Sequence, residues 1–345
     1  MLEHFIVYRN EGSYSAFPDI KRLANGELVV IFREALRRTR LTHLDSSSKA
    51  TLVRSRDGGQ TWTAHAPITV AEGGPDIGIQ DPSINQLRDG TLISNFFKWQ
   101  VYRDEPYGAE GLGAFVTTST DNGYTWDPNH VNVGRPPGIG AWVSTTDAVL
   151  ELPSGELLIP VYENNSVEGE QGGHRAFLMQ STDKGKHWQP WGLIGYDPFG
   201  NHHFEEPTLA YLPSGKLVCI LREDKRKEQA WQADSWDGGK TWSIPRRLPV
   251  WGHPQHLLRL QSGRLLMTYG YRRPPYGVRA CISADEGVTW DLPHELVLRS
   301  DGDNTDLGYP CSVQLENGQI LTVYYFHEPG ENGVRFIVGT VYEEW

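Results

Sequence analysis

One eight-residue phrase occurs five times in this chain, and this repetition constrains the fold more than any other feature. It reads SRDGGQTW at 55–62, STDNGYTW at 119–126, STDKGKHW at 181–188, SWDGGKTW at 235–242 and SADEGVTW at 283–290. Each copy fits Ser-x-Asp-x-Gly-x-Thr-Trp, except that His187 replaces the threonine of the third copy. A pattern of this length at five places indicates a protein built from repeated units.

The phrase, called an Asp turn below, has a mechanical explanation. The aspartate carboxylate can accept backbone N–H groups across a tight turn, and glycine tolerates a positive φ. The serine and threonine hydroxyls can tie the turn together, and the tryptophan can begin the next strand and pack into the core. We therefore expect five structural turns and no catalytic role for them.

Two more strands are predicted before each Asp turn, because short β-type runs flank a glycine-containing hairpin turn. The pairs of runs are 18–23 with 27–32, 82–87 with 91–97, 147–152 with 156–162, 207–212 with 216–222, 254–260 with 264–271 and 310–315 with 320–326. The chain therefore contains six units of strand, hairpin, strand, loop and strand, and no segment keeps a helical period of about 3.6 residues.

Six such units in a ring predict an all-β fold, a six-bladed β-propeller of four-stranded antiparallel blades. The last unit, 309–345, ends after its third strand, without an Asp turn. The segment HFIVYR, at about 4–9, can supply the missing strand and remove the exposed sheet edges. We therefore expect residues 1–345 to form a single propeller domain, closed by strands from both ends of the chain.

Composition excludes several classes of function. The formal net charge of -11 argues against nucleic acid and anionic membranes as partners, because both favour a basic surface. No apolar run reaches about 18 residues, so no membrane span is expected. The first residues, MLEHFIVYRNEGS, lack the pattern of a secretory signal. Cys219, Cys281 and Cys311 are expected to be buried free thiols in a reducing compartment, so we predict a cytoplasmic protein.

Candidate site residues follow from the ring. In a propeller, the innermost strand of each blade starts at the mouth of the central channel. Proline marks this start in five units, and Asp81, Glu206, His253 and Tyr309 directly precede four of these prolines. Polar residues gathered at one opening suit a ligand of the size of a sugar, although they could also simply solvate the channel.

With these residues in view, the whole chain resembles the sialidase family, whose Asp boxes look like the Asp turns. EPTLAYLPSGKLVCILR resembles a fourth-blade motif in which arginine follows a glutamate by sixteen residues, which implies site roles for Glu206 and Arg222. GYPCSVQLENGQILTVYY resembles the segment around the family's tyrosine nucleophile, which implies that role for Tyr309.

Three more segments carry the resemblance. LLMTYGYRRPPYGVRACIS resembles the segment that delivers another substrate-binding arginine, which implies Arg279. QDPSINQL resembles the second-blade start with its pocket aspartate, which implies Asp81. HLDSSSKATLVRSRDGG resembles the loop with the acid/base aspartate, which implies Asp45. His253 joins the expected substrate-binding residues through its place in the ring.

One position departs from the family. Its first blade opens with Phe-Arg-Ile-Pro, whose arginine belongs to a triad that binds the sugar carboxylate, whereas this chain has SAFP with Ala16 in that place. A charge-assisted hydrogen bond contributes ~1.5–3 kcal/mol, so we expect weak hydrolysis of ordinary sialosides. Arg33 or Arg37 could substitute, as could Arg38 or Arg40, although LRRTR also reads as a solvated loop.

The resemblance implies a retaining glycoside hydrolase that acts on an acidic sugar, sialic acid or a related one. Glu206 would accept the proton of Tyr309 as the phenol attacks, and a neutral nucleophile suits an anomeric centre that bears a carboxylate. Asp45 would protonate the leaving group and then activate water. Arg222 and Arg279 would bind the acid group. No cofactor or metal is expected, because the histidines at 202, 203, 253 and 256 lack ligand spacing.

Two alternatives stay open. A polysaccharide lyase could use Tyr309 or a histidine to abstract the proton α to a uronic acid carboxylate, and the presence of His253 in the ring together with Ala16 favours this reading. A non-catalytic carbohydrate-binding propeller is the other alternative, although binding alone needs no nucleophile–base pair. The partner is an acidic glycan or glycoside in each case, and the sugar, the linkage and the oligomeric state stay undetermined.

Overall fold

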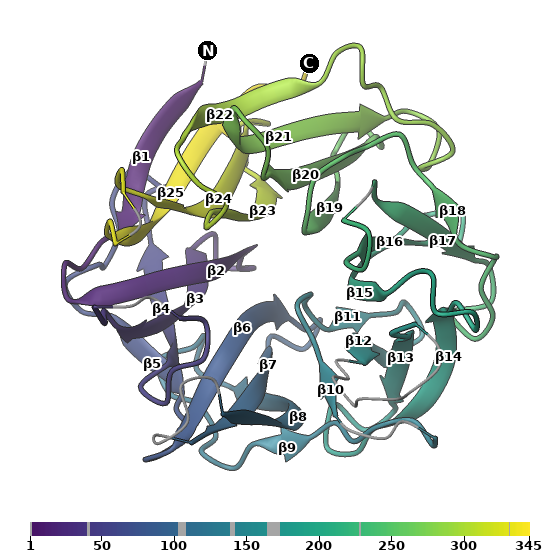
Figure 1. Ribbon diagram of the computed structural model, residues 1–345, viewed down its shortest axis with the longest axis horizontal. Coiled ribbons are helices and arrows are strands. Elements are labelled where there is room, and N and C mark those ends of the chain that lie inside the picture. The colour runs from purple at the N-terminus through teal and green to yellow at the C-terminus, as the bar shows by residue number, and fades with distance from the viewer. Residues whose placement is uncertain are drawn as a thin grey trace.

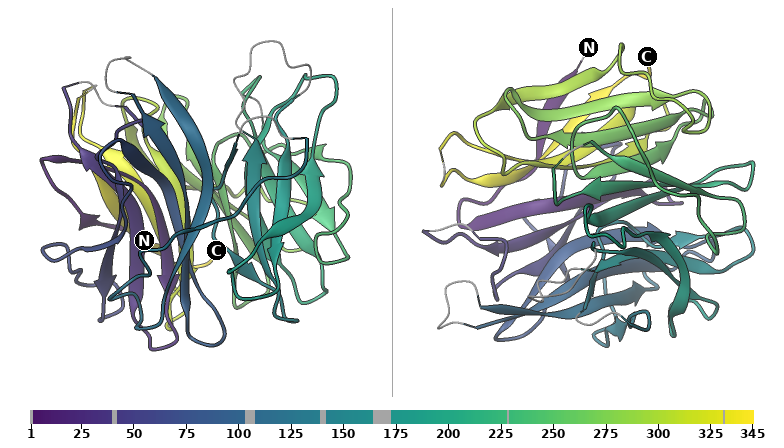
Figure 2. Two further views of the ribbon diagram at one scale, coloured as in Figure 1. Left: turned by 90° about the horizontal axis from the view of Figure 1, so that it is seen from below. Right: turned by 45° about the vertical axis from the view of Figure 1, so that its right-hand side comes forward.

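The computed structural model describes residues 2–39, 42–102, 108–138, 142–163, 173–227, 229–330 and 332–345. These residues form strands and turns without any helix, and so contain no helix that could cross a membrane. The sheets are arranged in a ring around a central axis (Figure 1), and their strands run roughly along that axis in the left view of Figure 2. The predicted all-β propeller is thus confirmed.

The largest sheet contains both ends of the chain and has eight strands. Its strands are β1 (Glu3–Tyr8), β2 (Ser13–Arg22), β3 (Leu28–Leu36), β4 (Lys49–Ser55), β5 (Ile68–Ala71), β23 (Gly308–Gln314), β24 (Ile320–His327) and β25 (Arg335–Tyr342). β1 pairs antiparallel with β25, from Glu3 opposite Val341 to Tyr8 opposite Ile337. One parallel pair, Tyr14 with Arg335, joins β2 to β25. Because of this pair, hydrogen bonds merge the first and last groups of four strands, and the count of six blades stays a prediction.

Four more sheets complete the ring. One sheet contains β6 (Ile77–Gln86), β7 (Leu92–Val101), β8 (Ala109–Ser119) and β9 (Val131–Asn132), and the next contains β10 (Val143–Ser144), β11 (Leu150–Glu151), β12 (Leu157–Glu163), β13 (Ala176–Ser181) and β14 (Gln189–Gly195). A further sheet contains β15 (Phe204–Tyr211), β16 (Leu217–Glu223), β17 (Trp231–Ser235) and β18 (Arg246–Arg247). The last contains β19 (Gln255–Arg259), β20 (Leu265–Tyr271), β21 (Tyr276–Ser283) and β22 (Leu296–Gly302).

The third unit departs from the prediction of one inner strand over 147–152. The short strand β11 lies within that range, the short strand β10 lies before it, and a side chain binds the segment between the two. Asn95 Nδ2 donates to the Asp147 carbonyl at 2.9 Å, and the Val149 N–H donates to Asn95 Oδ1 at 3.2 Å. The amide of a neighbouring sheet therefore satisfies backbone groups that a strand partner would otherwise bind.

Among the described residues, the core consists of six clusters of buried apolar side chains, each shared by two groups of strands that neighbour each other in the ring. The first cluster joins Val30 and Phe32 of β3 to Val323 and Tyr325 of β24, and all four are fully buried. Burying one large apolar side chain contributes about 1.5–3 kcal/mol, so these interfaces hold the ring together.

The Asp turns use the predicted bonds. In the first, Thr61 Oγ1 donates to Asp57 Oδ2 at 2.5 Å, and the Gly59 N–H donates to Ser55 Oγ at 2.8 Å. In the third, His187 Nδ1 lies 2.5 Å from Asp183 Oδ2 and takes the threonine's place.

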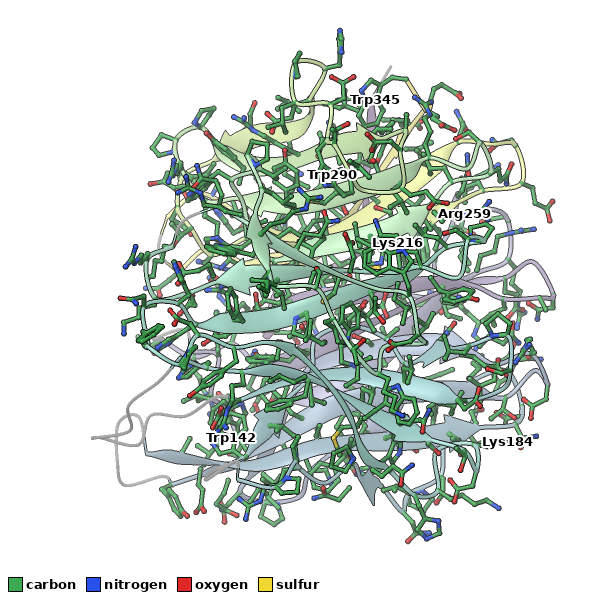
Figure 3. The ribbon with its side chains drawn as sticks, turned by 90° about the vertical axis from the view of Figure 1, so that its right-hand side faces the viewer. Trp142, Lys184, Lys216, Arg259, Trp290 and Trp345 are labelled. Carbon is green, nitrogen blue, oxygen red and sulfur yellow. The ribbon has the colours of Figure 1, made fainter. Side chains whose placement is uncertain are left out.

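These turns lie on the face of the ring opposite to the starts of the inner strands. Figure 3 shows Lys184, in the third Asp turn, on the face opposite to Trp142, which precedes β10. The Asp turns are therefore remote from the inner-strand starts and have a structural role.

Side chains near the axis tie the inner strands to one another. Asp19 Oδ2 accepts the Ile84 N–H at 2.7 Å, and Asp147 Oδ2 accepts the Leu209 N–H at 2.8 Å. Cys311 Sγ donates to Asp19 Oδ1 at 2.7 Å. Leaving such buried groups unpaired would cost ~1–3 kcal/mol each, so the bonds fix the strand starts relative to one another. All three cysteines are buried free thiols, as predicted.

Candidate active site

Four residues in the first half of inner strands share an unusual backbone conformation. Phe17, Asp81, Glu206 and Tyr309 each precede a proline and have positive φ values of 56°, 45°, 46° and 48°. The strand register shifts at the same four places. Proline cannot donate to the ladder, and a bulge re-aims the extra residue. Strained backbone of this kind is concentrated at functional sites, which makes these starts the candidate site.

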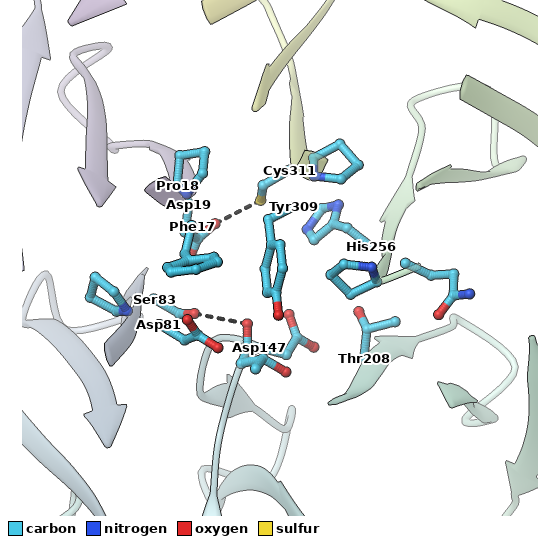
Figure 4. A pocket seen from close by; sticks show the side chains of 15 residues that line it. Phe17, Pro18, Asp19, Asp81, Ser83, Asp147, Thr208, His256, Tyr309 and Cys311 are labelled. Carbon is cyan, nitrogen blue, oxygen red and sulfur yellow. Dashed lines mark hydrogen bonds between the residues drawn. The ribbon is translucent and has the colours of Figure 1, made fainter. Parts of the chain in front are cut away.

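Three of these four residues, but not Glu206, line one cavity at the ring axis. Phe17 of β2, Asp81 of β6, Thr208 of β15, His256 of β19 and Tyr309 of β23 all line it, and Figure 4 shows their side chains converging there. Phe17 packs its ring against the edge of Tyr309, with centroids 4.6 Å apart. Five strands far apart in the sequence therefore contribute side chains to the lining of one cavity.

Tyr309, Glu206 and Arg222 form a connected group. Tyr309 Oη donates a hydrogen bond to Glu206 Oε1. Arg222 Nη1 donates to Glu206 Oε2 at 2.8 Å, and Arg222 Nη2 donates to Asp224 at 2.5 Å. The carboxylate thus accepts a phenol on one oxygen and a guanidinium on the other, which is suitable geometry for a nucleophile with its base.

The electrostatics of this group keep the phenol neutral. Burial raises the pKa of Tyr309 well above its ordinary value, the charges of Glu206 and Asp81 raise it further, and Arg222 and Arg272 oppose them. Burial also raises the pKa of Asp81, with the charge of Glu206 as the next cause. Asp81 Oδ1 is buried without a hydrogen-bond partner among the described residues. Asp81 therefore favours its protonated form.

Arg272 is a site residue that the sequence reasoning missed. Its guanidinium carbon lies 5.5 Å from the centre of the Tyr309 ring, and its Nε donates to the Leu307 carbonyl at 3.1 Å. Arg279, the arginine that the resemblance implied, is bound elsewhere. It pairs with Glu295 at 2.6 Å and stacks on Tyr271 at 3.4 Å.

No hydrogen bond, ion pair or ring contact within the described ranges links Arg279 to Tyr309 or Glu206. The signal for Arg272 was present, because both arginines lie in the same segment, 264–283. The sequence alone does not show which of the two side chains turns toward the axis.

The other arginines that could replace the missing one differ in burial and in partners. Arg33 is fully buried opposite Ala16 on the neighbouring strand, and its Nε and Nη1 have no hydrogen-bond partner among the described residues. Burial lowers the pKa of Arg33, whereas nearby acidic groups, among them Asp45 and Asp81, raise it. Arg37 lies on the surface and donates to backbone carbonyls. Residue 40 lies outside the described residues.

Asp45 is held as a carboxylate. Arg38 Nε donates to Asp45 Oδ2 at 2.9 Å, and the Ser47 N–H and hydroxyl donate to Oδ1 at 2.8 and 2.7 Å. Burial alone would raise the pKa of Asp45, but the bonds from Arg38 and Ser47 outweigh it, and the pKa is lowered. To act as an acid at neutral pH, Asp45 must therefore first lose its hydrogen bonds to Arg38.

His253 is buried and uncharged. Burial lowers the pKa of its imidazole to about 2, and the charges of Arg222 and Arg272 add to this effect. A base with so low a pKa has little affinity for a proton. The side chain can therefore donate or accept a hydrogen bond at the site, and it is poorly suited to abstract a proton from carbon.

Comparison with known proteins agrees with this architecture. The model of the BNR repeat-like domain family matches residues 45–322. A sialidase of Micromonospora viridifaciens is 25% identical over 210 residues, which cover 57% of this chain and 32% of that protein. A sialidase of Bacteroides fragilis (strain YCH46) is 24% identical over 311 residues, which cover 79% of this chain and 53% of that protein. The chain thus spans about a third to a half of these relatives.

Solved structures share the fold over nearly the whole chain. A protein of unknown function from Dyadobacter fermentans DSM 18053 is 32% identical with a TM-score of 0.88, covering 98% of this chain and 97% of that one. The Hadza microbial sialidase Hz136 is 18% identical with a TM-score of 0.73, covering 99% and 68%. The predicted resemblance is confirmed: the chain belongs to the BNR repeat-like domain family and has the propeller fold of the sialidase superfamily.

Proposed function

We propose that the chain is a retaining exo-glycosidase for an acidic sugar, sialic acid or a related one, with Tyr309 as its nucleophile. The observation that carries this proposal is the hydrogen bond from Tyr309 Oη to Glu206 at two bulged strand starts. As Tyr309 Oη bonds to the anomeric carbon, its proton passes to Glu206 and the bond to the leaving group breaks. The neutral phenol avoids the repulsion that a carboxylate nucleophile would meet at an acidic sugar.

Arg222 and Arg272 would bind the sugar carboxylate, in place of the Arg222 and Arg279 pair expected from the sequence. Both belong to the group around Tyr309, and guanidinium groups suit paired hydrogen bonds to a carboxylate. Arg33 would add positive charge near the site without contacting the substrate, since its side chain is fully buried. With two arginines instead of three in contact with the sugar carboxylate, one charge-assisted hydrogen bond of ~1.5–3 kcal/mol is missing, so sialosides should be poor substrates.

Asp45 would act as the acid and then as the base. It would give its proton to the leaving oxygen and later take a proton from water as the Tyr309–sugar bond breaks, which retains the configuration. The bond to Arg38 must open first. The form of the lyase alternative that uses His253 as the base loses support, because the low pKa of this imidazole makes it a weak base. The form that uses Tyr309 stays an alternative, which the substrate screen distinguishes.

The proposal also includes a six-bladed ring that forms one domain. Six core clusters, each between neighbouring groups of four or five strands, support six blades. The pairing of β1 with β25 supports closure by both chain ends.

A substrate screen tests the proposed function. Purified protein would be assayed on aryl glycosides of sialic acid, related ulosonic acids, uronic acids and neutral sugars. We expect release of the aryl group from an acidic ulosonide, with the product's initial configuration retained by NMR. A product absorbing in the ultraviolet would indicate a lyase. Binding without turnover of any glycoside would indicate a binding propeller.

A further inference from the structure

A second cluster of functional side chains lies beside the candidate active site and is not used by the proposed reaction. It consists of His174, His203 and Glu205, whose ligand atoms all lie within 4.8 Å of one another. His174 Nδ1 is 2.5 Å from Glu205 Oε1, and the two imidazole rings stack with centroids 3.9 Å apart. Glu205 directly precedes Glu206, so the cluster lies at the margin of the site.

Backbone hydrogen bonds hold His174 and His203 in place. The Phe204 N–H donates to the His174 carbonyl at 3.1 Å, and the Asp224 N–H donates to the His203 carbonyl at 3.1 Å. The cluster therefore joins the start of β15 to the segment before β13, which belongs to the neighbouring sheet. Ligands on such a rigid frame can keep a fixed geometry.

The local charge balance favours a cation. Glu205 lies opposite Arg222 in the ladder, and only 12% of its side chain is exposed. The Arg222 guanidinium, however, pairs with Glu206 and Asp224. Arg222 is therefore occupied by two other carboxylates, and Glu205 has His174 as its ion-pair partner, so a divalent ion bound by both residues would supply positive charge at Glu205 that Arg222 does not.

The donor set selects the class of metal. Two imidazole nitrogens and one carboxylate oxygen are ligands that Zn²⁺ binds well, and they leave a fourth position for water. Ca²⁺ and Mg²⁺ prefer oxygen ligands alone. Exposed pairs elsewhere differ, because His187 and His294 each meet a single aspartate and are 89% and 74% exposed. We propose that His174, His203 and Glu205 bind a zinc ion at the margin of the active site.

The test uses the full chain after treatment with EDTA and buffer exchange. Zinc would be titrated by calorimetry, and Co²⁺ would be used as a spectroscopic probe. We expect one saturable zinc site per chain and visible Co²⁺ bands of low-symmetry N/O ligation, without thiolate charge transfer, since the cysteines are buried elsewhere. Glu205→Gln and His203→Ala should each weaken zinc binding by at least ~10–100-fold, the loss typical of even an indirect ligand partner.

His187→Ala serves as the matched control, because it removes an exposed histidine that pairs with one carboxylate. Circular dichroism would verify that each variant is folded, and Glu205→Gln, which is isosteric, carries the test if His203→Ala does not fold. Absence of a saturable zinc site in the parent protein would overturn the proposal. Equal zinc affinity in the Glu205→Gln variant and the parent would overturn it as well.

Discussion

Ala16 and Arg33 lie directly opposite each other on β2 and β3, and both are fully buried. The small residue stands directly before the bulge at Phe17, and the arginine stands on the strand behind it. Side chains of directly paired residues lie side by side on one face of an antiparallel ladder, so a longer side chain at Ala16 would compete with Arg33 for space. This relationship explains how a positive charge stays near the site although the inner strand carries none at this place.

The first prediction concerns this pair. Ala16→Arg alone should destabilise the fold, because overpacking a core costs ~1–3 kcal/mol and two guanidinium groups would repel each other. The double variant Ala16→Arg/Arg33→Ala should recover stability and hydrolyse sialyllactose better than the parent. Urea unfolding and kcat/KM would be measured. A stable Ala16→Arg variant with raised sialidase activity would show that Arg33 does not prevent an arginine at position 16 from binding the sugar carboxylate.

The second prediction concerns the protonation of Asp45. Arg38 lowers the pKa of this carboxyl, so Arg38→Ala should raise it and extend the protonated acid to higher pH. The alkaline limb of kcat/KM should then move upward. Arg37→Ala is the control, because Arg37 contacts only backbone carbonyls among its hydrogen-bond partners. Equal pH profiles for the two variants would remove Asp45 from the acid role.

Much of the site could be predicted from the sequence, because the repeats and prolines locate the inner-strand starts. Tyr309 and Glu206 therefore came together as expected. Arg272 was missed because Arg279 lies in the same hairpin, and side-chain direction there depends on the partner Glu295. The broken inner strand of the third unit was missed too, because a side chain of the neighbouring sheet, Asn95, determines it.

The third prediction concerns ring closure. Deleting the first ten residues removes β1 together with its core residues Val7 and Tyr8, and it exposes the edge of β25. Burying each such side chain contributes about 1.5–3 kcal/mol, and the whole domain is stable by only ~5–15 kcal/mol. We expect a strong loss of thermal stability or of soluble protein. A melting temperature equal to that of the parent would refute closure by this strand.

The fourth prediction concerns acid. Hydrogen bonds from Thr61 and Ser55 lower the pKa of Asp57 to about 2, below the unfolded value of about 3.9. The stability from this carboxylate is thus present above about pH 4 and is lost as pH falls through about 2. Asp57→Asn should be less stable than the parent at pH 6, and the gap should shrink at pH 2–3. Urea unfolding at both pH values measures it, and a constant gap would contradict the linkage.

The central claim is that the Tyr309 oxygen attacks the sugar. Tyr309→Phe keeps the ring and its contact with Phe17, so the melting temperature should barely change. Tyr325→Phe is the control, since Tyr325 Oη donates a hydrogen bond to Asp306 and accepts one from Arg272, and neither partner is Glu206.

The deciding measurement is kcat of Tyr309→Phe on the best acidic aryl glycoside from the screen, beside that of Tyr325→Phe. The account predicts a fall of at least ~10³-fold for Tyr309→Phe, with product binding intact, and a much smaller loss for Tyr325→Phe. Full turnover by a folded Tyr309→Phe protein would contradict it.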